Sequence, residues 1–103
     1  MIDGALLIGG EARQATDRFT AVNPANGETL SPDFSSTGSD AVAEACALAD
    51  AAFPAYAATD PETRAAFLER IADNILAIGD TLIERAMAES GLPRARLEGE
   101  RGR

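Results

Sequence analysis

The stretch DPETRAAFLERIADNILAIGDTLIERAMAESGLP, residues 60–93, decides the fold of this chain because it encodes two successive helices. Apolar side chains recur every three or four residues, the spacing that places them on one helix face. The pattern predicts one helix over about 61–78 and a second over about 81–90. The expected apolar faces consist of Phe67, Leu68, Ile71, Ile75 and Ile78 in the first helix, and of Leu82, Ile83, Ala86 and Met87 in the second.

The start of the first helix carries two possible signals. Pro61 suits the first helical position with Asp60 as its cap, because proline has no amide hydrogen to leave unpaired there. A capping box formed by Thr59 and Glu62 is the alternative.

Gly79 and Asp80 predict a stop and a restart between the two helices. Gly79 favours the left-handed conformation that closes a helix, and Asp80 is expected to cap the next one. Gly91 and Pro93 are expected to end that second helix. The charged residues that follow predict the start of a further helix.

Upstream, the segment SDAVAEACALADAAFPAY predicts an earlier helix over about 39–54. Ser39 is the expected N-cap, and Asp40 complements the helix dipole in the first turn. Pro54 is expected to end the helix or to strain its last turn. The expected apolar face consists of Val42, Ala45, Cys46, Ala49 and Phe53.

Residues of about 5–34 predict a small antiparallel hairpin or meander. ALLIGGEA indicates a short strand and a Gly-Gly turn, and RFTAV a second strand. The NPANG turn follows, and Pro32 keeps the next extended segment short or at a sheet edge. Strands followed by helices place the chain in the α+β class.

Composition limits both the core and the partners. The 103 residues suit one small domain or part of a larger one. Ala supplies much of the 46% apolar fraction and aromatic residues are only 5%, so we expect a thin core. The net charge of −8 disfavours binding to nucleic acid. Residues 94–103 are a local exception, since they hold four of the nine Arg but only two of the 17 acids.

Cysteine usage and the N-terminus indicate a compartment. Cys46 is the single cysteine, so no internal disulfide can form and a reducing compartment is the default. The opening MIDGALLIGG has no basic residue before its short apolar run, and no stretch is long enough to cross a membrane. The sequence therefore predicts a cytoplasmic protein with no membrane partner.

A search for chemistry assigns no catalytic, cofactor-binding or metal-binding residue. The chain has no His, the usual base near neutral pH, and Cys46 is expected to be a small core residue rather than a thiolate. The IGGEA turn lacks the spacing of a phosphate loop. The Arg cluster of 94–103 either binds a carboxylate or phosphate or pairs with acids of its own helix, and the second interpretation is favoured.

Three stretches in this order resemble the N-terminal segment of the NAD(P)-dependent aldehyde dehydrogenases: LLIGGEAR (6–13), FTAVNPANGETL (19–30) and residues 60–93. The motifs F-x-x-x-N-P-A-x-G-E and E-x-G-x-P carry the resemblance. Most family members have G-K-P where this chain has G-L-P at 91–93. The tail SGLPRARLEGERGR is most similar to the branch acting on 2-oxoglutarate semialdehyde (2,5-dioxopentanoate, or 2,5-dioxovalerate).

The resemblance implies that the parent enzyme has the α/β aldehyde dehydrogenase fold. Residues 1–103 would be the incomplete N-terminal part of its coenzyme-binding domain. The parent is expected to oxidise an aldehyde, 2-oxoglutarate semialdehyde to 2-oxoglutarate, with NAD or NADP, through a Cys thiohemiacetal and thioester. It is also expected to be a homo-oligomer.

In that family the nucleotide-binding turn, the nucleophilic Cys and the base Glu lie further along the chain, and no position here matches their motifs. This segment is therefore expected to be an inactive scaffold that binds no cofactor and contacts the remainder of the chain. Some members hold a structural cation near the positions of the Val22 carbonyl and Glu89. Two ligands do not make a site, so no metal residue is assigned.

The alternative hypothesis is a free-standing, small acidic helical module that binds another protein through an exposed apolar groove. A thin core motivates it, because the helix stripes then need a partner.

Overall fold

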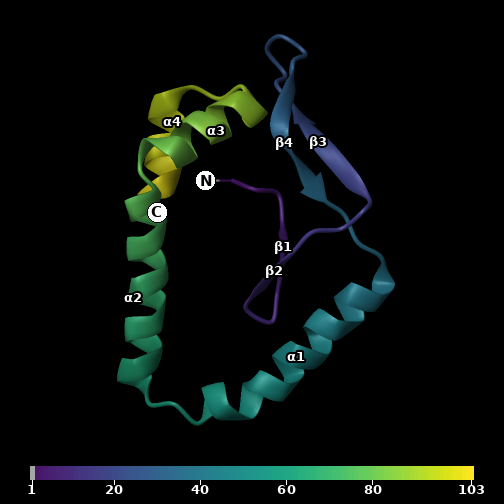
Figure 1. Cartoon of the computed structure of the whole chain (residues 1–103). Helices are drawn as coiled ribbons and strands as arrows, with labels where there is room; N and C mark the ends of the chain where they lie inside the picture. The colour runs from purple at the N-terminus through teal and green to yellow at the C-terminus, as the bar shows by residue number, and fades with distance from the viewer. Residues whose placement is uncertain (1) are drawn as a thin grey trace. The chain divides into compact units, whose positions relative to one another are not determined.

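The computed structural model describes residues 2–103, which form four short strands followed by four helices (Figure 1). The elements are β1 (Leu6–Ile8), β2 (Glu11–Arg13), β3 (Arg18–Val22), β4 (Thr29–Ser35), α1 (Ser39–Ala57), α2 (Pro61–Ile78), α3 (Asp80–Ser90) and α4 (Arg94–Arg101). This order confirms the α+β class. The chain divides into two compact units: residues 2–21 with 31–59 form the first, and residues 22–30 with 60–103 form the second.

In the first unit, β1 and β2 form an antiparallel hairpin. Leu6 lies opposite Arg13, and Ile8 lies opposite Glu11. Gly9 makes the turn with a φ of 62°, a conformation that a residue with a side chain rarely adopts. A Cβ atom on Gly9 would lie 2.9 Å from Leu48 Cδ1 of α1, so the turn comes close to that helix. The expected Gly-Gly turn is confirmed.

Ser35, at the end of β4, joins three segments of the first unit. Its backbone N–H donates to the carbonyl of Gly4 at 2.7 Å, and its hydroxyl accepts from the N–H of Ala15 at 3.1 Å. The same hydroxyl donates to Gln14 Oε1. Among the residues that the structure describes, Ser35 is the one polar residue that is buried. These three hydrogen bonds provide partners for its backbone N–H and its hydroxyl group.

Helix α1 differs from the expectation at both ends. Gly38 is the N-cap and makes no side-chain cap bond, so the prediction of Ser39 as the cap was wrong. The helix also continues through Pro54 to Ala57 rather than ending at residue 54. A proline this close to the end removes one amide donor, but its carbonyl still accepts the N–H of Ala58 at 3.2 Å.

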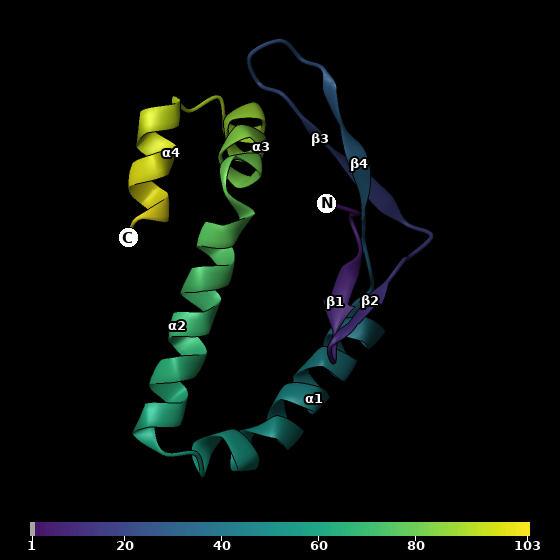
Figure 2. The same ribbon diagram turned by 60° about the vertical axis from the view of Figure 1, so that its left-hand side comes forward.

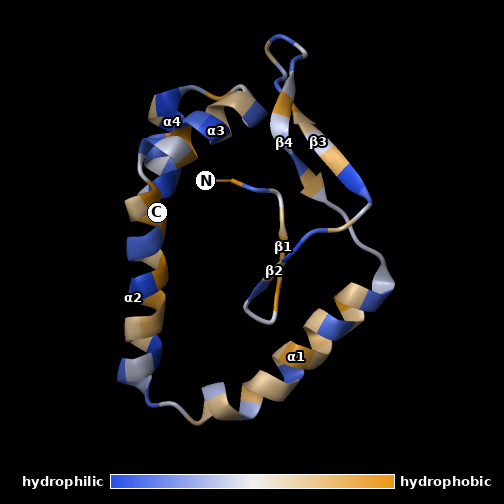
Figure 3. Cartoon of the chain, in the orientation of Figure 1, coloured by the Kyte–Doolittle hydropathy of each residue, from blue (hydrophilic) through white to orange (hydrophobic). Residues whose placement is uncertain are grey.

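The apolar face of α1 is open. Val42, Cys46 and Phe53 are exposed, so the prediction that Cys46 is a core residue was wrong for the described chain. Contacts with α1 in the first unit include the Gly9 turn, which lies against Leu48, and an ion pair of Arg13 with Glu44 at 2.8 Å. Figure 3 shows hydrophobic residues along most of this helix.

In the second unit, residues 22–30 form the tip of the hairpin between β3 and β4. The carbonyl of Asn23 accepts the N–H of Gly27 at 2.8 Å, and the N–H of Asn23 donates to Glu28. The side-chain amide oxygen of Asn23 also accepts from Ala25. The NPANG turn is thereby confirmed. Pro32, which belongs to the first unit, lies inside β4, in a sheet of two strands where both strands are edges.

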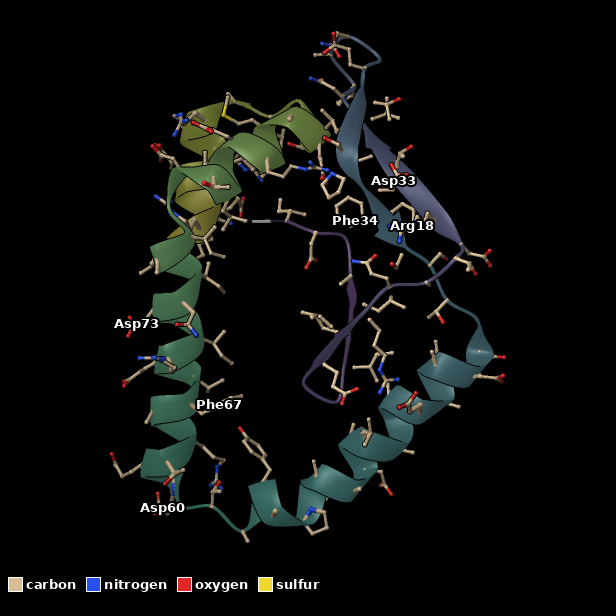
Figure 4. The ribbon with its side chains drawn as sticks, in the orientation of Figure 1. Arg18, Asp33, Phe34, Asp60, Phe67 and Asp73 are labelled. Carbon is tan, nitrogen blue, oxygen red and sulfur yellow. The ribbon has the colours of Figure 1, made fainter. Side chains whose placement is uncertain are left out.

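Helix α2 starts as the sequence predicts. Asp60 is the N-cap, its carboxylate accepts the N–H of Thr63 at 2.7 Å, and Pro61 is the first helical residue. Figure 4 shows Asp60 at this end of the helix, and Phe67 and Asp73 projecting from different sides of it. No α2 residue is buried within the part of the chain that the structure describes.

Helices α3 and α4 lie side by side and contact each other (Figure 2). Gly79 closes α2 with the expected positive φ of 68°, but its ψ of −140° differs from the left-handed conformation that was predicted, and it is also the N-cap of α3. Asp80 makes no cap bond, so that prediction was wrong. Gly91 ends α3 in the left-handed conformation, as predicted. Ile83 of α3 is 2% exposed and is the most buried large side chain among residues 2–103.

Candidate functional site

A cavity of about 550 Å³ lies within the second unit, between the hairpin tip and the α3–α4 connection. Its apolar lining comes from the hairpin turn, from the last turn of α3 and from the connection itself. Gly91 allows the turn to approach, because a Cβ there would lie 3.3 Å from Pro24 Cγ. The lining residues are Asn23, Ala25, Glu84, Met87, Ala88, Gly91, Leu92, Pro93 and Arg94.

Arg94 at the rim of this cavity is surrounded by carboxylates. Its Nη1 lies 3.2 Å from Asp80 Oδ1 and 3.5 Å from Glu98 Oε1, and its Nη2 lies 3.6 Å from Glu84 Oε1. The hydrogen bond to Glu98, followed by the charge and hydrogen bond of Asp80, raises the pKa of Arg94 above its ordinary value. Its positive charge is already balanced, so this rim does not favour a bound anion.

The opposite end of α4 is held by Arg101. Its guanidinium donates to the carbonyl of Gly79 at 3.2 Å, just before α3 begins. Arg94 and Arg101 therefore attach the first and last residues of α4 to the start of α3. Neither contact was predicted from the sequence. The sequence did contain one signal for the Arg94 contacts. An Arg in the first turn of a helix is unfavourable next to the positive end of the helix dipole, so nearby acidic side chains would stabilise it.

The remaining charges of the C-terminal cluster pair within it. Arg96 Nε lies 2.8 Å from Glu100 Oε1, and Arg103 also pairs with Glu100. The favoured interpretation, a helix surface that pairs its own charges, therefore holds for Arg96 and Arg103, whereas Arg94 also pairs with acids of α3. Exposed pairs of this kind contribute little to stability.

The residues that the structure describes do not form a cluster of reactive side chains. Cys46 is an exposed single thiol on α1, and Glu89 is paired with Arg85 of the same helix. Within residues 2–103, no group of three or more His, Cys, Asp or Glu side chains is placed to hold a metal ion.

The residues present do not fit a nicotinamide coenzyme. A dinucleotide is held at a glycine turn that leads from a buried parallel strand into a helix N-terminus. In this chain Gly9 and Gly10 lead from β1 into β2, within an antiparallel hairpin.

Among the helices of residues 2–103, none is long and apolar enough to cross a membrane.

The family model of the aldehyde dehydrogenases matches residues 11–103, and the chain belongs to that family. The fold of short antiparallel strands followed by helices is consistent with this assignment.

Relatives within the family carry specific names. The chain is 51% identical to alpha-ketoglutaric semialdehyde dehydrogenase 2 of Azospirillum brasilense, over 99% of this chain and 20% of the relative. It is 44% identical to alpha-ketoglutaric semialdehyde dehydrogenase of Acinetobacter baylyi, over 68% of this chain and 13% of that protein. It is 41% identical to vanillin dehydrogenase of Pseudomonas fluorescens, over 84% of this chain and 18% of that protein.

The chain thus spans about a fifth of the length of the curated relatives that it matches. No solved structure matches it.

Proposed function

We propose that residues 1–103 are the N-terminal part of the coenzyme-binding domain of an NAD(P)-dependent aldehyde dehydrogenase. The complete enzyme oxidises an aldehyde to a carboxylic acid, with water supplying the second oxygen and NAD(P)⁺ accepting the hydride. This proposal rests mainly on the 51% identity to a relative of this class over 99% of the chain. The segment itself is a scaffold that performs no chemical step.

The proposed substrate is 2-oxoglutarate semialdehyde, which gives 2-oxoglutarate. Two of the relatives are named for this activity, and the more similar of them aligns over almost the whole segment. The residues that would contact the aldehyde are not among these 103. Assay of the complete enzyme carrying this segment, with 2-oxoglutarate semialdehyde and vanillin as competing substrates, tests the assignment. A preference for vanillin would contradict it.

The open face of α2 supports the scaffold role. Phe67 is 52% exposed and Leu68 60%, although both lie on the apolar stripe of the helix. Ile71, Ile75 and Ile78 of the same stripe are exposed as well. Burying one such side chain stabilises a folded protein by about 1.5–3 kcal/mol. The exposed face of α2 therefore lacks the stabilisation that a covering surface would provide. We propose that the remainder of the dehydrogenase chain covers this face, since the relatives are about five times as long.

A chimera tests the scaffold role directly. The segment of the Azospirillum brasilense relative that aligns with this chain is replaced by residues 1–103. We expect a soluble enzyme that reduces NAD(P)⁺ with 2-oxoglutarate semialdehyde. The matched control carries Phe67→Asp and Ile71→Asp, which place charge on the face to be covered, and it is expected to be insoluble or inactive. If the double variant were as soluble and active as the chimera, the proposal that the remainder of the enzyme covers this face of α2 would be refuted.

The 103-residue chain alone is the second control. Incubated with the semialdehyde and NAD⁺ or NADP⁺, it is expected to produce no absorbance of reduced coenzyme at 340 nm. Turnover by the purified chain would contradict the scaffold role.

A further inference from the structure

We draw no further inference here: the strongest candidate, the open apolar cavity between the hairpin tip and the α3–α4 connection, carries none because nothing in the structure shows what covers it.

Discussion

The guanidinium of Arg94, the first residue of α4, donates a hydrogen bond to the carboxylate of Asp80, the first residue of α3, with 3.2 Å between Nη1 and Oδ1. The contact spans 14 positions in the sequence and connects the starts of two helices. The carboxylate of Asp80 does not cap α3, because the N-cap position is occupied by Gly79, which has no side chain.

Arg94→Gln is expected to loosen α4. The variant removes the charge that faces Asp80, Glu84 and Glu98, so the amides of α4 should exchange with solvent deuterium faster than in the parent chain. Added salt should accelerate exchange in the parent chain and have less effect in the variant, because it screens the same ion pairs. Arg96→Gln is the matched control, since Arg96 pairs with Glu100 inside α4. Equal exchange in both variants would argue against a tether between the helices.

Acid is expected to weaken the start of α2 through Asp60. The backbone N–H of Thr63 donates to this carboxylate and lowers its pKa below the ordinary value of 3.8. The folded state therefore favours the ionised form, and the stability that it contributes is present above that ordinary value. That contribution is lost as the pH falls through the lower pKa of the folded chain.

Circular dichroism at 222 nm from pH 5 to pH 2 measures this loss. Asp60→Asn keeps an oxygen that can accept from Thr63 but does not titrate, so its helix signal should fall less in acid. Asp73→Asn removes a carboxylate from the middle of α2 and should keep the acid transition of the parent chain. An unchanged transition in Asp60→Asn would show that other carboxylates dominate.

Ile83→Ala is expected to be the most damaging apolar truncation. Ile83 is 2% exposed, and removing a buried Ile side chain costs roughly 2–5 kcal/mol because lost burial and a cavity add together. Ile78, 51% exposed on α2, is the control, and Ile78→Ala should stay within about 0.5 kcal/mol. Urea unfolding followed by circular dichroism compares the two. Similar midpoints would mean that Ile83 is not central to the core.

Gly4→Ala is expected to destabilise the first unit. Gly4 has a φ of 68°, and an added Cβ would lie 2.1 Å from the carbonyl oxygen of Asp33. Gly10 has a φ of 81° but open space around it, so Gly10→Ala measures the backbone strain alone. Both variants should lower the thermal midpoint, and Gly4→Ala by more, because it adds a clash and disturbs the bond from Ser35. Equal losses would assign the whole effect to backbone conformation.

Local signals in the sequence predicted those features that depend on neighbouring residues. Asp60 and Pro61 placed the start of α2, and Gly91 placed the end of α3, because a cap and a positive φ act over one turn. The helix expected at residue 39 was also present, but the choice of Ser39 over Gly38 as its cap was wrong. Two adjacent residues with good cap propensity cannot be separated by propensity alone.

Features that depend on distant residues were not predictable. Asp80 was expected to cap α3, and its pairing with Arg94 required knowing how α4 returns along α3. The exposure of Cys46 likewise depends on what covers α1, which no periodicity specifies. The family assignment came from motif order, which reflects the whole fold rather than these local interactions, and the comparisons confirm it.

The exposed thiol of Cys46 has a practical consequence. It is the single cysteine of the sequence and lies on the apolar face of α1, so a maleimide dye would label one defined position of that helix. The fluorescence of a polarity-sensitive dye at this position would report directly when the face of α1 passes from water into a protein interior. Joining the segment to the rest of a dehydrogenase could thus be followed in real time, independently of any enzymatic readout.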